Sequence, residues 1–225
     1  MVFGLRSYNT SGYVQIDEYY ANYVPVTSGY TVIQDATATI SGAISIGPVI
    51  GVPNYGIMPM VFIQNVSGYP VALHSVGVNY IRFAKEYTGT PFDVGFNWMV
   101  AYPASVVVGP QPGFGLEVYA PGGPLAFSSD VGYTRVQDVL QIPALGWGGT
   151  AAMSAYHPNP WLLVSNTFGQ RYLGDETFQL GYTYFLGLRC NGGTQVVATM
   201  MIEQGGMGYS PTAADTIATI AVLKN

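Results

Sequence analysis

The chain has 225 residues, of which 49% are hydrophobic and only 8% are Asp, Glu, Lys or Arg, against roughly 25% charged residues in a typical soluble domain. The formal net charge is −5 and no Lys or Arg occurs between Arg6 and Arg82, which disfavours binding to nucleic acid or to anionic membrane surfaces. A surface with so few charges loses little when neighbours bury it, so the composition favours a subunit of a larger assembly over a freely diffusing enzyme.

Two further features bear on the compartment in which the protein folds. Cys190 is the single cysteine, so an intrachain disulfide is impossible and a disulfide-stapled secreted scaffold is excluded. The N-terminus lacks a basic region followed by a long apolar run, so we expect no signal peptide. The most apolar segment, residues 40–52, is interrupted by Gly and Pro and is shorter than the roughly 20 residues of a membrane helix. We therefore expect cytoplasmic folding and no membrane insertion.

The elements predicted along the chain are almost all β-strands. The 29 Gly and 15 Pro residues interrupt the chain too often for long helices, and the runs between them are rich in Val, Ile, Tyr, Phe and Thr. The first element is a β-hairpin, with strands at 5–8 and 13–17 around a turn at 9–12. Later strands are predicted at residues 31–34, 37–40, 60–64, 78–83, 95–102, 136–142, 161–165, 179–188, 194–203 and 216–223, with a second hairpin at 116–127. One helical turn is predicted at 210–215.

The second half of the chain repeats features of the first in the same order. Phe3-Gly4-Leu5, with Tyr8 and Gly12, recurs as Phe114-Gly115-Leu116, with Tyr119 and Gly123, at a constant offset of 111 (114 − 3). Residues 59–65 recur as 160–166 (160 − 59 = 101) and residues 92–98 as 178–184 (178 − 92 = 86). We interpret the falling offset as loop residues lost from the second copy.

This repeat predicts an all-β fold of two tandem related β-sandwich domains with little helix. The first domain is expected at residues 1–110 and the second at 111–225, with a C-terminal extension that adds two strands. The boundary is placed at residues 109–113, where two Pro and two Gly in five residues break strand geometry.

Candidate catalytic residues are few, and a structural role is expected for each. His74 and His157 have no acid or metal ligand beside them in the sequence. Cys190 precedes the turn Asn191-Gly192-Gly193 and is expected to be a small buried hydrophobic residue. The sequence has no convincing pair of carboxylates, calcium loop or phosphate loop. We predict no catalytic residue, no cofactor and no metal site.

Tyrosine is the residue type with an expected binding role. The chain has 18 Tyr, and its large ring with a polar tip suits interfaces and the stacking of glycans. Tyr19, Tyr20 and Tyr23 are crowded in one stretch, which predicts an interaction surface there. The alternative is that these tyrosines are divided between the core and scattered surface positions.

The opening Gly4-Leu5-x-x-Tyr8-x-x-x-Gly12, with Asp17 a few residues later, resembles the start of minor tail, tail-tip and tail-fibre proteins of long-tailed bacteriophages. Residues 115–123 match the pattern about as well, but Ser128, Ser129 and Asp130 follow in place of an acid at the aligned position. The resemblance covers about 15 residues in each half. It implies a virion component at the distal tail that contacts the host surface.

The leading hypothesis is therefore a non-enzymatic structural subunit of a phage tail tip or tail fibre, assembled in the host cytoplasm. Its expected partners are other tail proteins and further copies of itself. A carbohydrate-binding module that recognises a host glycan or receptor is the first alternative, and a capsid decoration protein is the second. A polysaccharide hydrolase is a weaker alternative, since the chain is short and lacks a carboxylate pair.

Overall fold

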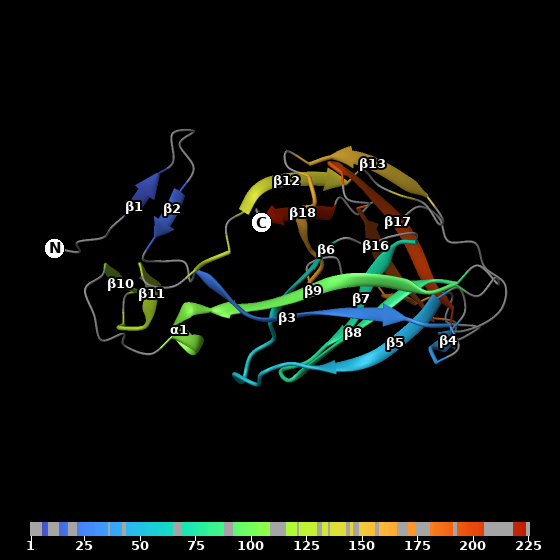
Figure 1. The fold of residues 1–225 in the computed structure, drawn as a ribbon, viewed down its shortest axis with the longest axis horizontal. Helices are drawn as coiled ribbons and strands as arrows, with labels where there is room; N and C mark the ends of the chain where they lie inside the picture. The colour runs from blue at the N-terminus through green and yellow to red at the C-terminus, as the bar shows by residue number, and fades with distance from the viewer. Residues whose placement is uncertain are drawn as a thin grey trace.

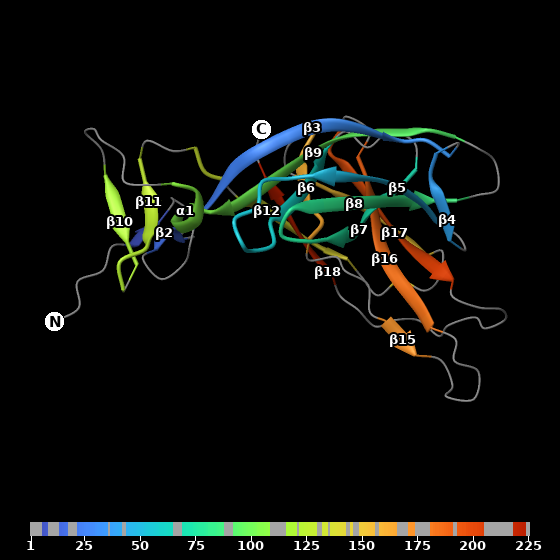
Figure 2. The ribbon, with the colours of Figure 1, turned by 90° about the horizontal axis from the view of Figure 1, so that it is seen from below.

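A computed structural model of the protein describes most of the chain. The described residues are 6–8, 14–17, 22–35, 37–41, 44–64, 69–87, 92–108, 116–120, 122–129, 132–134, 136–142, 145, 149–155, 158–165, 171–173, 181–190, 193–204 and 218–223. Strands dominate this part, and its one α-helix is a single turn, α1 (Ala104–Val107). The predicted all-β fold class is thereby confirmed. Two small hairpins and α1 lie at one end of the molecule, and two large sheets form the rest (Figures 1 and 2).

The two hairpins are built alike. In the first, β1 (Arg6–Tyr8) pairs with β2 (Val14–Asp17), and in the second, β10 (Glu117–Tyr119) pairs with β11 (Leu125–Ser128). Both have the same register and the same bulge, which leaves Gln15 without a partner in β2 and Ala126 without one in β11. Each pairing in one hairpin reappears 111 residues later in the other, so the first sequence correspondence is confirmed by the backbone.

The larger part of the molecule consists of two sheets. The six-stranded sheet has the order β12-β18-β14-β6-β9-β3. Its strands are β3 (Tyr23–Ile33), β6 (Met60–Gln64), β9 (Val94–Pro103), β12 (Val136–Ile142), β14 (Trp161–Leu163) and β18 (Ala218–Leu223). The eight-stranded sheet has the order β13-β17-β16-β7-β8-β5-β4, and β15 pairs with β16. Its strands are β4 (Thr39–Ser41), β5 (Ile44–Gly51), β7 (Val71–Val76), β8 (Tyr80–Glu86), β13 (Thr150–Ser154), β15 (Arg171–Leu173), β16 (Gly181–Arg189) and β17 (Gln195–Gln204).

One hydrophobic core lies between these sheets, and both halves of the chain contribute to it. Alternate residues of β6 and β9 point into this core, as a pleated sheet requires. The core includes Val61, Ile63, Phe83 and Phe96 from the first half. It also includes Leu140, Leu162, Leu188 and Val196 from the second half.

The two halves are joined strand to strand in both sheets. β6 pairs with β14 in the six-stranded sheet, and β7 pairs with β16 in the eight-stranded sheet, both antiparallel. The prediction of two separate sandwiches at 1–110 and 111–225 is therefore not confirmed. Because an unpaired strand edge exposes a row of backbone hydrogen-bonding groups, the inner edges of the halves satisfy one another. The predicted boundary at 109–113 lies outside the described residues.

The strand order of one half nevertheless repeats in the other. We call the pairings of β6 with β14 and of β7 with β16 the seam. Towards the seam, the first half contributes β3-β9-β6 to one sheet and β5-β8-β7 to the other, with β4 as an additional strand at the outer edge of the second. The second half contributes β12-β18-β14 and β13-β17-β16 in the corresponding places. β3 and β12 also share a bulge at positions 111 residues apart, where Val26 and Gln137 have no partner.

The two segments of the second sequence correspondence, residues 59–65 and 160–166, pair with each other at the seam. Phe62 and Leu163, which are related by the offset of 101, are direct partners across β6 and β14. Leu162 lies opposite Ile63, and the backbone N–H of Val164 donates to the carbonyl of Val61 over 2.8 Å. Equivalent positions of the two copies thus contact each other, as they do in an interface about a twofold axis.

The third sequence correspondence is wrong. Residues 92–98 lead into β9 of the six-stranded sheet, whereas residues 178–184 lead into β16 of the eight-stranded sheet. By strand order, β16 corresponds to β7, and the last two strands, β17 and β18, correspond to β8 and β9. The predicted C-terminal extension supplies two strands, but they occupy places that the first half also fills.

Candidate functional site

The most unusual polar group of the described chain is a lysine inside the sandwich. Lys85 lies on β8 between Ser45 of β5 and Val71 of β7, and its side chain is 0% exposed. Its Nζ lies 2.6 Å from Oδ1 of Asp35, whose side chain is 6% exposed. Asp35 follows β3, so this pair connects the end of a strand in one sheet to the last residues of β8 in the other.

Other groups complete the surroundings of Asp35. Ser45 donates its hydroxyl to Oδ1 over 2.7 Å, and the backbone N–H of Phe92 donates to Oδ2 over 2.9 Å. The Nζ of Lys85 lies 3.7 Å from the centre of the Phe92 ring, and Tyr69 stacks on the same ring at 3.6 Å between centroids. We call Asp35, Ser45, Lys85 and Phe92 the buried Lys–Asp cluster.

The ionisation of Asp35 follows from these contacts. Burial by itself raises the pKa of Asp35, because it disfavours the charged form. The close contact with the positively charged Lys85, together with the hydrogen bonds from Phe92 and Ser45, outweighs burial and holds the pKa of Asp35 below its ordinary value. Asp35 therefore rests as a carboxylate at ion-pair distance from Lys85.

A second polar group lies on the outer face of the eight-stranded sheet, across the seam between the halves. Nε2 of His74 on β7 is 3.5 Å from Oε2 of Glu203 on β17, and the imidazole stacks on Phe185 of β16. Burial lowers the pKa of His74, Glu203 acts in the opposite direction, and Arg82 lowers it further. The net shift is downward, so His74 is a neutral structural residue at pH 7. His157 lies outside the described residues.

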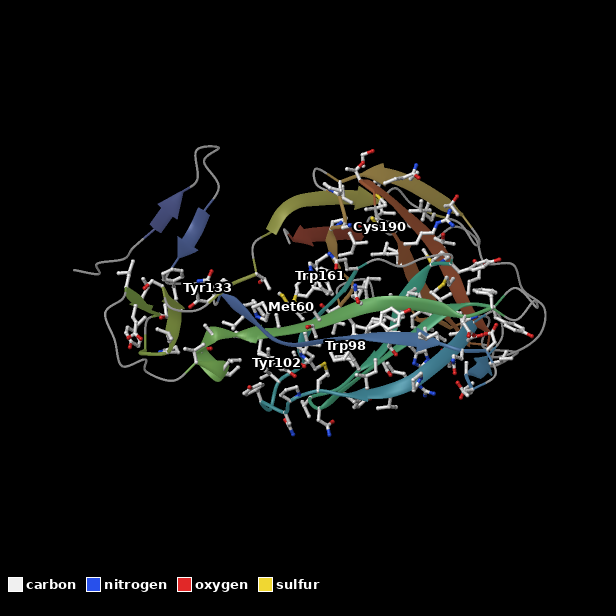
Figure 3. The ribbon with its side chains drawn as sticks, viewed as in Figure 1. Met60, Trp98, Tyr102, Tyr133, Trp161 and Cys190 are labelled. Carbon is white, nitrogen blue, oxygen red and sulfur yellow. The ribbon has the colours of Figure 1, made fainter. Side chains whose placement is uncertain are left out.

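The outer faces of both sheets carry apolar clusters. On the six-stranded sheet, Phe62, Ala101 and Leu163 are buried around the seam. Four half-buried residues pack against them: Tyr23, Met60, Met99 and Trp161, of which Met60 and Trp161 are labelled in Figure 3. We call these seven residues the outer apolar strip. The outer face of the eight-stranded sheet has a second cluster, which includes Ile44, Phe185 and Met201.

The predicted tyrosine surface is only partly described. Tyr23 opens β3 and is half-buried in the outer apolar strip. Its backbone carbonyl accepts hydrogen bonds from the N–H and the hydroxyl of Thr134 at 2.9 and 3.2 Å. Tyr19 and Tyr20 lie outside the described residues, so an interaction surface formed by all three stays a prediction.

Cys190 is buried as expected. It follows β16 and is 1% exposed, and its thiol donates to the carbonyl of Gly193 over 3.2 Å. A small hollow of about 250 Å³ lies near this turn and is lined by Arg189, Gly193, Gln195 and Val197. Among these described lining residues, Arg189 is the one cationic side chain.

Sequence reasoning missed the buried Lys–Asp cluster. Lys85 is one of only two lysines in the chain, with Lys224, and it occupies an inward position of a strand. A charge in that position was the signal that could have been noticed. Within the described residues, no three His, Cys, Asp or Glu side chains are grouped as a metal site requires. No helix in that part is long and apolar enough to span a bilayer.

Comparison with known proteins gives no match: no family model, no curated protein and no solved structure is significantly similar to this chain.

Proposed function

We propose that this protein is a non-enzymatic structural subunit of a bacteriophage virion, located at the tail tip or tail fibre. The observation that carries the proposal is the repeated hairpin. Each occurrence of the tail-protein-like opening motif runs into a hairpin with the same register and the same bulge. The motif therefore specifies a defined structural unit that this chain carries twice.

We further infer that the two halves are copies of one β-sheet unit that have merged into a single sandwich. The shared bulges at an offset of 111, the matching strand orders and the self-pairing of Phe62 with Leu163 support this. In this form the tandem arrangement is retained, although the copies share their sheets and core.

The surface supports an assembly role. With 8% charged residues, the exterior offers little repulsion to a neighbouring subunit and few charges to desolvate. The outer apolar strip adds a half-buried Trp, Tyr and two Met residues, the residue types enriched at protein interfaces. Other tail proteins and further copies of this chain are the partners that such a surface suits.

The direct test is to find the protein in the particle. Purified virions of a phage that encodes this chain are expected to contain it, by mass spectrometry, at a fixed copy number. Immunogold labelling is expected at the tail end distal to the capsid. Labelling of the capsid would favour a decoration protein instead, and absence from purified virions would refute a virion role.

Carbohydrate binding is a second candidate, favoured by the position of Tyr23 and Trp161. Both rings are half-buried at the outer apolar strip, and aromatic rings are a common platform for sugar stacking. Binding to host cells or to a glycan array is expected to fall at least tenfold in Trp161→Ala and in Tyr23→Ala. The matched control is Tyr119→Ala, since Tyr119 is exposed on β10 and does not belong to the outer apolar strip. Equal binding by all three variants would exclude the strip as a glycan site.

A further inference from the structure

The buried Lys–Asp cluster has the components of an amide-forming site. An amine and a carboxyl group, 50 residues apart in sequence (85 − 35), are held together inside the sandwich. Their distance of 2.6 Å is that of a close ion pair, yet Nζ of Lys85 has no hydrogen bond of ordinary geometry to any described residue. The Nζ atom therefore approaches the carboxyl group of Asp35 at an angle that differs from that of an ordinary N–H···O hydrogen bond.

The distance is suitable for attack on carbon. A carbon–oxygen bond of a carboxyl group is about 1.2 Å long, so Nζ is at most about 3.8 Å from the carboxyl carbon of Asp35. Reacting atoms in near-attack geometry are about 3–3.5 Å apart. A small displacement of the lysine side chain therefore brings the nitrogen within near-attack distance of the carbon.

The neighbours of Asp35 fit the electronic needs of this step. The hydroxyl of Ser45 and the N–H of Phe92 each donate to one carboxyl oxygen. The same donors stabilise the negative charge that grows on oxygen when a nucleophile adds to the carbon. Phe92 and Tyr69 form an aromatic cover beside the amine, and exclusion of water reduces the cost of passing through a neutral amine and acid.

We propose that Lys85 and Asp35 form an intramolecular isopeptide bond after the chain has folded. A proton first passes from the ammonium of Lys85 to the carboxylate of Asp35, which leaves a neutral amine and a carboxylic acid. The amine nitrogen adds to the carboxyl carbon, the carbon–oxygen bond to the hydroxyl breaks, and one water leaves with the second amine proton. Every atom comes from the ion pair itself, so the reaction needs no oxidant and no co-reactant. The bond joins β8 to the end of β3 and is independent of the proposed virion role.

The test is the mass of the purified, folded full-length chain, measured after denaturation. The wild-type protein is expected to be lighter than its calculated mass by one water, about 18 Da. Trypsin cuts after Arg82 and has no other site between Arg6 and Arg82, so the bond is expected to keep peptides 7–82 and 83–135 together, with no cut after Lys85. A folded wild-type chain at its full calculated mass, with the two peptides separate, overturns the proposal.

Three variants identify the bonded atoms. Lys85→Met is expected to show its full calculated mass, because the amine is gone. Asp35→Asn keeps an electrophilic carbon but releases ammonia, so its expected loss is about 17 Da. Lys224→Met, which removes the other lysine, is expected to keep the loss of one water. Persistence of the loss in Lys85→Met, or its disappearance in Lys224→Met, also overturns the assignment.

Discussion

At the scale of single residues, the strands β3 and β9 depend on a glycine that lies beneath an aromatic ring. Gly29 is opposite Trp98, and a Cβ at residue 29 would lie 2.8 Å from the indole atom Cζ2. Trp98 is 8% exposed and belongs to the core, so its ring has little room to move. The close approach explains a glycine in the middle of a long strand, where the residue otherwise weakens the strand.

Gly29→Ala is therefore expected to lower the free energy of unfolding by about 1–3 kcal/mol, the usual cost of overpacking a core. Urea denaturation followed by tryptophan fluorescence measures this. Gly51→Ala is the matched control, because a Cβ at residue 51 meets no atom within 4 Å, and we expect almost no change. Equal effects in the two variants would contradict the role given to Trp98.

His74 links stability to pH. Its pKa is lowered in the folded protein, chiefly by burial, whereas in the unfolded chain it is about 6.5. Below that value the unfolded state binds a proton that the folded state resists, so the contribution of His74 is full above pH 6.5 and is lost as pH falls through the folded pKa. The free energy of unfolding is expected to decline less between pH 7.5 and pH 5.5 in His74→Gln than in the wild-type protein. His157→Gln controls for the second histidine and is expected to keep the wild-type decline. An unchanged pH dependence in His74→Gln would rule out this linkage.

At the scale of elements, the β10–β11 hairpin is attached to the sandwich through its bulge. The carbonyl of Ala126, the residue left without a partner in β11, accepts from the backbone N–H of Asn22 at 3.4 Å and from its Nδ2 at 2.8 Å. On the other side, the hydroxyl of Tyr133, labelled in Figure 3, accepts from the N–H of Ser128. The bulge thus frees a carbonyl for a contact outside the hairpin.

Asn22→Ala is expected to weaken this attachment by about 1 kcal/mol, the usual contribution of one hydrogen bond. Amide exchange in β10 and β11 should become roughly fivefold faster, while exchange in the core strands β8 and β9 stays unchanged. Asn97→Ala, on β9, offers a control that leaves the hairpin contact intact. Slower exchange in the hairpin, or equal acceleration in the core, would contradict the assigned contact.

The sequence was informative where structure is local. The hairpin at Tyr8 and its copy at Tyr119 were predicted correctly, as were the bounds of β6 and β12, because turn residues and alternation are local signals. β5 was missed because Gly47 and Pro48 interrupt its apolar run, although its bulge accommodates them. β7, β13, β15 and α1 were also missed.

Long-range pairing was not predictable in the same way. Phe92 and Phe178 begin similar runs of Gly and aromatic residues, and such a pattern describes a half-buried strand in either sheet. Nothing in it specifies the partner strand, so β9 and β16 were matched wrongly. The buried Lys–Asp cluster depends on the same long-range information, since Asp35 and Lys85 meet only when the two sheets are stacked.

At the scale of the whole molecule, strand pairing across the seam makes the two halves fold as one unit. β6 and β14 are central strands that pair with each other, and their inward residues enter one core. Neither half can bury these residues without the other half. The two sequence copies therefore behave as one folding unit, whereas separate sandwiches would be two.

Leu162→Ala tests this directly. Leu162 is 0% exposed at the seam and lies opposite Ile63, so the truncation is expected to cost about 2–5 kcal/mol. Because the core is shared, the loss should appear equally in both halves, in the most protected amides of β8 and of β17, by hydrogen exchange. Val49→Ala, at an exposed position of β5, is expected to leave both unchanged. Loss of protection confined to β17 and its neighbours would mean that the first half holds its structure alone, and the single shared core would then be wrong.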